Sequence, residues 1–182
     1  EVAKGSYIAR ADADDLYEPD RLKLQLKYLQ ENMNISMVGS NVKYIDKDGN
    51  FLNFSNLPID YFNIKSRLFF HNPLIHSTIF FRSKIFKKAP YNEQFITTQD
   101  YEMYCRIINN HIIENIRIPL AKYRVHNQSI SNKKRDLQIK NTLIIQESYY
   151  KQNFNNCFPL KKFKLFNEFF MSDYLNIVNN IK

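Results

Sequence analysis

The sequence has 182 residues and a net charge of +8, with 44% hydrophobic and 24% charged residues. This composition is ordinary for a globular domain and excludes a low-complexity or collagen-like chain. No apolar run approaches the ~18–20 residues that span a bilayer, so no transmembrane segment is expected. The two cysteines form no C-x-x-C pair, and we expect reduced thiols, with Cys105 in the core.

The first predicted elements are a strand and a helix. Residues 7–11 have the pattern of a short buried strand, and Pro19 suits the first position of the helix that follows. In "DRLKLQLKYLQEN", Leu22, Leu26 and Leu29 recur at spacings of four and three. This spacing predicts a helix with one buried stripe.

Strands and helices then alternate along the chain. The β-branched residues 35–46, the turn "DKDGN" and residues 51–54 predict a hairpin, and Asp60 is a candidate cap for the next helix. The later patterns predict a strand at 76–83, a short helix at 83–89, a helix at 97–110 with a Thr cap, one or two strands at 112–126, and helices beyond 136. This alternation predicts an α/β layer architecture with a helical C-terminal appendage that starts near residue 132.

An acidic cluster follows the first strand in "IARADADD". Residues two apart in a strand point to one side, so Asp12 and Asp14 are expected to converge at the C-terminal end of that strand, where open α/β sheets bind ligands. Two carboxylates with few other ligands suit Mg²⁺ or Mn²⁺, which also bind water and phosphate oxygens. The alternative is a solvated acidic turn that caps the next helix.

Five blocks of the sequence, in order, resemble the family 2 glycosyltransferases of bacterial polysaccharide synthesis. They are residues 3–32, 37–49, 72–83, 91–107 and 120–131. The resemblance implies a GT-A fold, a Rossmann-like mixed sheet flanked by helices. Residues 1–131 would then be the C-terminal part of the catalytic domain, and residues 132–182 a helical appendage. Arg21 and Gln25 match family positions, although a salt bridge or a helix-to-loop bond explains them as well.

The resemblance also implies how the donor is held. Asp12 and Asp14 look like the metal-binding D-x-D element, with Asp15 as its acidic neighbour, and the metal would bridge the phosphates of a nucleotide-diphosphate sugar. Arg124 and His126, in "YRVH", are expected to approach the diphosphate or the acceptor, because Arg is a natural phosphate partner. The alternative for an isolated histidine is a structural hydrogen bond.

The match for the catalytic base is Asp100, in "QDYEMY". A positioned carboxylate can take the proton of an acceptor hydroxyl as it attacks. Asp100 also lies in the first turn of a predicted helix, where a capping role is the alternative. The preceding residue is usually acidic in the family and here is Gln99. Glu102 is a candidate for a substitute base, although it should face elsewhere on the helix.

The resemblance therefore implies an inverting, metal-dependent transferase of the cytoplasm, acting at the inner face of the plasma membrane on a glycan or lipid-linked acceptor. Family members carry a nucleotide-binding strand and helix before the D-x-D element, and we expect that segment to be missing here, which leaves the activity of the fragment open. Gln99 and the missing segment favour the alternative, a degenerate, non-catalytic binding or scaffolding domain. The presence of Asp12, Asp14 and Asp15 together favours a catalytic domain.

The C-terminal region is basic, with nine Lys/Arg against four Asp/Glu from Lys133 onward. A basic face favours anionic partners or is a solvated surface. A nucleic-acid partner is not expected, because no recognition motif accompanies the charge. Within residues 159–182 an apolar stripe lies beside lysines, which predicts either contact with an anionic membrane or packing against the catalytic domain.

Overall fold

The computed structural model describes residues 3–125 and 134–154. Its strands are β1 (Tyr7–Ala9), β2 (Leu16–Tyr17), β3 (Ile35–Ile45), β4 (Phe51–Phe54), β5 (Phe80–Arg82) and β6 (Ile112–Arg124). Its helices are α1 (Arg21–Glu31), α2 (Tyr61–Arg67), the 3₁₀ turn η1 (His76–Thr78), α3 (Ser83–Lys88), α4 (Gln99–Ile107) and α6 (Arg135–Phe154).

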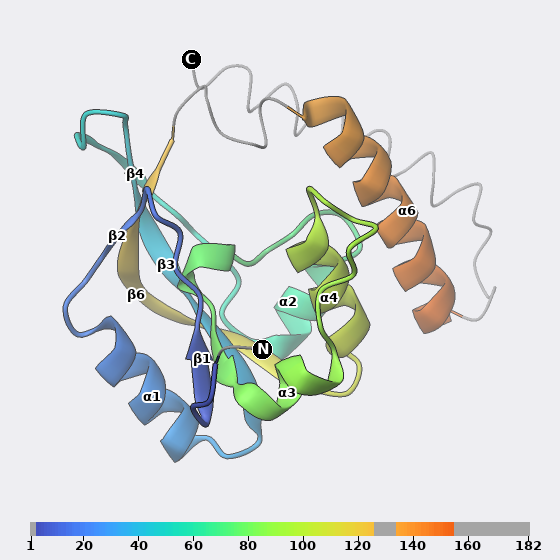
Figure 1. Ribbon diagram of the computed structural model, residues 1–182, viewed down its shortest axis with the longest axis horizontal. Coiled ribbons are helices and arrows are strands. Elements are labelled where there is room, and N and C mark those ends of the chain that lie inside the picture. The colour runs from blue at the N-terminus through green and yellow to red at the C-terminus, as the bar shows by residue number, and fades with distance from the viewer. Residues whose placement is uncertain (1–2, 126–133, 155–182) are drawn as a thin grey trace.

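The strands form one mixed sheet in the order β1-β5-β3-β6-β2, with β4 paired to β3 outside this path. The central pair β3 and β6 is parallel, and the other pairs are antiparallel. Helix α1 lies on one face of the sheet, while α2 and α4 lie on the other and α6 packs outside them (Figure 1). The expected α/β architecture with a mixed sheet and flanking helices is confirmed.

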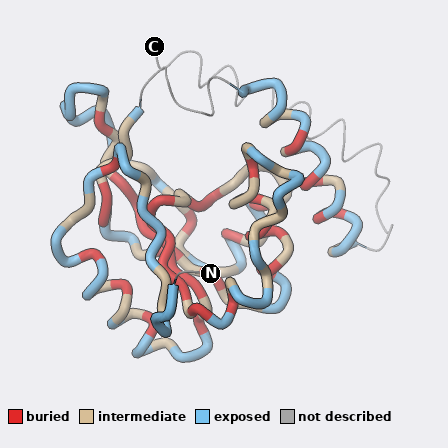
Figure 2. The backbone as a smooth tube through the Cα atoms, in the orientation of Figure 1, coloured by how far each residue is buried: buried red, intermediate tan, exposed pale blue. Residues whose placement is uncertain are grey.

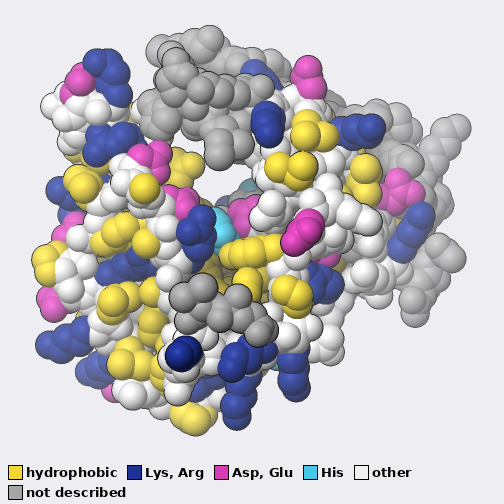
Figure 3. Space-filling model, viewed as in Figure 1, with side chains coloured by type: hydrophobic (Ala, Val, Ile, Leu, Met, Phe, Trp, Pro, Cys, Tyr) yellow, Lys and Arg dark blue, Asp and Glu magenta, His cyan; other side chains and the backbone are white. Residues whose placement is uncertain are grey.

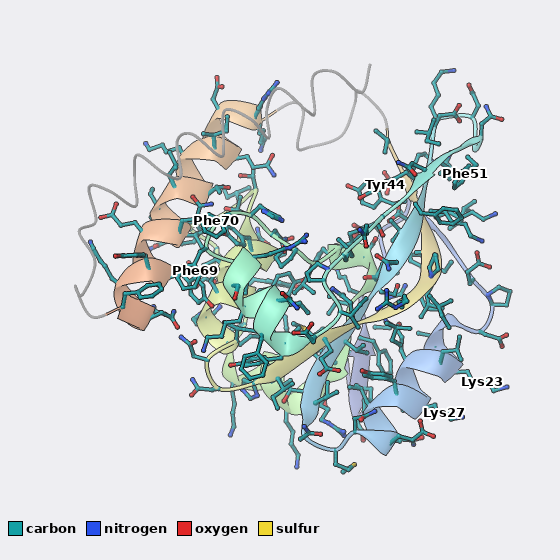
Figure 4. All side chains as sticks on the ribbon, turned by 180° about the vertical axis from the view of Figure 1, so that it is seen from behind. Lys23, Lys27, Tyr44, Phe51, Phe69 and Phe70 are labelled. Atoms are coloured by element: carbon teal, nitrogen blue, oxygen red, sulfur yellow. The ribbon has the colours of Figure 1, made fainter. Side chains whose placement is uncertain are left out.

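The hairpin predicted from "DKDGN" is present as β3 and β4. Asp46 Oδ1 accepts the backbone N–H groups of Asp48 and Asn50, both at 2.9 Å, which closes the turn. Gly49 has φ = +93°, a left-handed conformation that side chains other than glycine rarely adopt. Tyr44 and Phe51 lie on the two strands of this hairpin in Figure 4.

The buried face of α1 differs from the predicted leucine stripe. Its buried residues are Arg21, Gln25 and Leu29, whereas Leu22 is 53% exposed. Gln25 Nε2 donates to the carbonyl of Thr78 at 2.7 Å and Arg21 Nε donates to Gln25 Oε1 at 3.0 Å. The helix thus lies over a chain segment whose carbonyl groups need donors, so two polar side chains are buried. On the opposite side, Lys23 and Lys27 extend away from the sheet (Figure 4).

The main core lies between the sheet and the helices α2, α4 and α6, and a smaller cluster lies beneath α1 (Figure 2). Cys105 is buried in the main core, as expected. Ile145 and Tyr149 of α6 belong to the same core, and the Tyr149 ring lies 4.5 Å from that of Phe69. Helix α6 therefore packs against the body of the molecule, beside Phe69 and Phe70 in Figure 4.

Two local predictions were wrong. The segment predicted as a strand at 76–83 forms η1 first, and only Phe80–Arg82 pair in the sheet. Thr98 precedes α4, but its side chain makes no capping hydrogen bond within the described residues. His126, the boundary near residue 132 and the segment 159–182 lie outside the described residues.

Candidate active site

The acidic turn, residues 12–15, connects β1 to β2. Its conformation is held by Tyr17, whose hydroxyl accepts the Asp12 N–H at 2.6 Å and donates to the Asp12 carbonyl at 3.1 Å. Strand β2 pairs with β6, with Leu16 opposite Lys122. The turn is therefore fixed between β1 and the C-terminal end of β6.

Asp15 is the buried member of the acidic turn, with 7% of its surface exposed. Its Oδ1 accepts the backbone N–H of Arg124 at 2.9 Å, while Oδ2 and the Ser77 Oγ are buried without a hydrogen-bond partner in the part of the chain described. Burial raises the pKa of Asp15, and the carboxylates of Asp14 and Asp12 act in the same direction, against the Arg124 N–H that donates to Asp15. Asp15 thus supports the turn from inside the fold.

Asp12 and Asp14 are the accessible members of the turn. Asp12 Oδ1 forms an ion pair with Arg10 Nη2 at 2.8 Å, and Asp14 is exposed. Among the described residues, no group of three His, Cys, Asp or Glu side chains gathers as a metal site. Two carboxylates nevertheless fit Mg²⁺ or Mn²⁺, because these cations take several oxygen ligands from water and phosphate. The metal role of Asp12 and Asp14 stays a prediction.

Arg124, at the end of β6, binds backbone carbonyl groups. Its Nε donates to the Asp14 carbonyl at 2.9 Å, and its Nη1 donates to the carbonyls of Asp46 and Lys47 at 3.0 and 2.9 Å. The guanidinium therefore clamps the acidic turn to the β3–β4 hairpin. Its expected contact with a diphosphate stays a prediction.

Asp100 lies in the first turn of α4 and is half-buried. Its Oδ2 accepts from Asn72 Nδ2 at 2.8 Å. Glu102, the alternative base, instead forms two hydrogen bonds with Arg106, at 2.8 and 2.9 Å. The two acidic side chains of this helix thus have different partners: Asp100 bonds to Asn72 on a loop, whereas Glu102 pairs with Arg106 on its own helix.

His76 connects Asp100 electrostatically with the acidic turn. Its Nδ1 lies 2.7 Å from the Tyr104 hydroxyl and its Nε2 lies 3.0 Å from the Tyr91 hydroxyl. Burial lowers the pKa of His76, while Asp100 and Asp12 raise it. Carboxylates from two distant segments therefore act on one imidazole. Figure 3 shows a histidine and acidic side chains in the hollow between the β1 side and the α4 side of the molecule.

Sequence reasoning did not find the polar neighbours of this site, Asn72, Tyr91 and Tyr104. The available signal for Tyr104 was its position four residues after Asp100, which places both on one helix face. Asn72 and Tyr91 lie on loops, and their approach to Asp100 and His76 depends on the tertiary fold.

A mixed sheet flanked by helices, with an acidic turn at the end of one strand, defines a GT-A-like α/β domain. The sequence matches the profile of Glycosyl transferase family 2 over residues 1–117. The chain belongs to this family, whose members transfer sugars.

Named relatives agree with this assignment. The chain is 38% identical over 129 residues to an uncharacterized glycosyltransferase, MJ1057, of Methanocaldococcus jannaschii, a match that covers 70% of this chain and 44% of that protein. It is 35% identical over 130 residues to the O-antigen biosynthesis glycosyltransferase WbnJ of Escherichia coli, covering 69% and 50%. The chain thus spans about half the length of the curated relatives it matches.

Among solved structures, the crystal structure of S. aureus TarS 1–349 is similar, with a TM-score of 0.50 and 14% identity. The match covers 84% of this chain and 50% of that one. At this identity the likeness supports the fold alone.

None of the helices in the described ranges 3–125 and 134–154 is long and apolar enough to cross a bilayer.

Proposed function

We propose that this chain is part of the catalytic domain of an inverting glycosyltransferase, which moves a sugar from a nucleoside diphosphate donor to a hydroxyl of a glycan or lipid-linked acceptor. The observation that carries the proposal is that the segment 76–79 contacts both acidic elements: His76 Nδ1 lies 2.7 Å from the Tyr104 hydroxyl of α4, and the Ile79 carbonyl accepts the Arg10 N–H at 2.8 Å, just before the acidic turn. This arrangement supports a site with a donor side at the acidic turn and an acceptor side at Asp100, as a reaction between two substrates needs.

The acidic turn is the donor side of the proposed site. Asp12 and Asp14 would hold Mg²⁺ or Mn²⁺, which when bound offsets the negative charge of the donor diphosphate. Asp15 and Arg124 fix the backbone of the turn, because the Arg124 N–H donates to Asp15 Oδ1 at 2.9 Å and the Arg124 Nε donates to the Asp14 carbonyl. We also include the predicted approach of Arg124 and His126 to the diphosphate in this proposal.

Asp100 is the acceptor side. In the proposed step, the acceptor hydroxyl gives its proton to the Asp100 carboxylate while its oxygen forms a bond to the anomeric carbon. The bond from that carbon to the nucleoside diphosphate breaks on the opposite face, so the configuration inverts. Glu102 is not proposed as the base, because both of its oxygens are hydrogen-bonded to Arg106.

The acceptor class is proposed from the named relatives. WbnJ is an O-antigen biosynthesis glycosyltransferase, and AmsE of Erwinia amylovora, 26% identical over 129 residues, is an amylovoran biosynthesis glycosyltransferase. A growing cell-surface polysaccharide or its lipid-linked precursor is therefore the acceptor we propose, at the cytoplasmic face of the membrane. Peripheral contact through residues 159–182 is part of the same proposal.

The proposal is tested on the complete polypeptide, the product of the whole reading frame that contains these residues. UDP-, GDP- and dTDP-sugars are supplied with Mn²⁺, with and without membrane acceptors, and release of the nucleoside diphosphate is measured. Release from at least one donor, lost in Asp12→Asn and Asp14→Asn, is expected. Failure to bind or cleave any donor would favour the non-catalytic scaffolding alternative.

A further inference from the structure

We propose that Asn72 is a positioning residue that fixes the carboxylate of Asp100 for proton abstraction. This inference rests on the proposed role of Asp100 as the catalytic base. Asn72 Nδ2 donates to Asp100 Oδ2 at 2.8 Å, which joins the loop after α2 to the first turn of α4.

The orientation of the Asn72 amide is determined by its second partner. Its Oδ1 accepts the backbone N–H of Leu74 at 3.1 Å. Since a backbone N–H can only donate, the oxygen must face Leu74 and the NH₂ group must face Asp100. An exchange of the two amide atoms would break both bonds. Asn72 is therefore a donor to Asp100 and holds the carboxylate in one orientation.

The loop that carries Asn72 is anchored to α4 on both sides. Before it, the Tyr101 hydroxyl donates to the Leu68 carbonyl. After it, the Tyr104 hydroxyl lies 2.7 Å from His76 Nδ1, and Leu74 is buried in the main core. The position of Asn72 relative to Asp100 is thus fixed by contacts with the helix that carries Asp100.

We infer that Asn72 opposes a second orientation of Asp100, toward the start of α4. The first N–H groups of a helix have no intrahelical partner and attract a carboxylate. Thr98 makes no side-chain capping bond to α4 within the described residues, so these groups offer Asp100 an alternative. Without the Asn72 donor, the carboxylate is free to turn toward the helix end and away from the site it shares with His76.

The experiment compares Asn72→Ala and the isosteric Asn72→Asp in the complete polypeptide, using the nucleoside diphosphate sugar that the wild type cleaves fastest in the panel above. We expect kcat to fall about 100-fold in both variants, as for a misplaced reacting group, with the donor KM unchanged within about twofold. The matched control is Asn63→Ala, which removes another amide-to-carboxylate bond, from Asn63 Nδ2 to Asp60 Oδ2 (2.6 Å), at an exposed helix cap.

A double-mutant cycle with Asp100→Asn separates a positioning role from a structural one. If Asn72 acts through Asp100, adding Asn72→Ala to Asp100→Asn causes no further loss of kcat. An equal loss in both backgrounds, or wild-type kcat in the Asn72 variants, would overturn the inference. Full turnover in Asp100→Asn alone would instead overturn the proposed base. Thermal unfolding of each variant identifies losses caused by misfolding.

Discussion

The backbone N–H of Arg124 donates to the buried carboxylate of Asp15 at 2.9 Å, across 109 residues of sequence. This bond connects the acidic turn to the end of β6, and the Arg124 side chain adds a second connection through the Asp14 carbonyl. The turn that carries Asp12 and Asp14 is thereby attached to the end of the long parallel pair formed by β3 and β6.

Replacing Asp15 with Asn tests the cost of this buried charge. The pKa of Asp15 is raised by burial, so the folded state favours the neutral form, and the wild type loses stability as pH rises above the unfolded value of 3.8. We expect Asp15→Asn to be the more stable protein at pH 7, with the difference shrinking as pH falls toward 4. Urea unfolding at both pH values measures it.

Asp15→Ala is the control for that experiment. It removes the acceptor of the Arg124 N–H and is expected to cost about 1–3 kcal/mol of unfolding free energy. If Asp15→Asn were as destabilised as Asp15→Ala at pH 7, the carboxylate would be stabilising in its charged form, contrary to the account above.

Substitutions of the two acidic residues of α4 are expected to differ in their effect on kcat. Asp100→Asn should lower kcat by about 10²–10⁴-fold, because the acceptor loses its base. Glu102→Gln should leave kcat near the wild-type value, since Glu102 pairs with Arg106. Steady-state release of nucleoside diphosphate checks both. Loss of turnover in Glu102→Gln, with Asp100→Asn active, would reverse the assignment.

The polar face of α1 predicts an unusual stability pattern. Gln25→Ala should cost about 1–3 kcal/mol, because it leaves the Thr78 carbonyl and the Arg21 Nε without their bonds. Leu22→Ala should change stability by less than about 0.5 kcal/mol, since Leu22 is largely exposed. Urea denaturation should therefore show a larger loss of unfolding free energy in Gln25→Ala than in Leu22→Ala. A larger loss in Leu22→Ala would instead support the buried leucine face that the sequence predicted for this helix.

Local signals in the sequence predicted much of the fold. The turn at Gly49, the cap at Asp60 and the helix around Asp100 each depend on nearby residues, and all three are present, with Asp60 Oδ1 accepting the Asn63 N–H at 3.0 Å. The burial of Gln25 was not predictable in this way, because an apolar pattern counts leucines and its partner, Thr78, is distant in sequence.

In the candidate site, too, the features that depend on neighbouring residues were predicted, and those that depend on distant residues were not. The acidic turn was found because its carboxylates are adjacent in sequence, and Asp100 because it lies in a block that resembles the family. Its neighbours Asn72 and His76 come from a loop and from the 3₁₀ turn η1, which only the tertiary fold places against α4. The sequence also did not reveal that the Arg124 side chain binds backbone carbonyls.

Binding of Mn²⁺ in the presence of a nucleoside diphosphate tests the central claim most directly. Titration calorimetry on the complete polypeptide, with UDP, GDP or dTDP, should show Mn²⁺-dependent binding that weakens at least about tenfold in Asp12→Asn and Asp14→Asn. Asp100→Asn should bind as the wild type does, because it lies on the acceptor side. Unchanged binding in both acidic-turn variants would contradict the claim that this turn holds the donor.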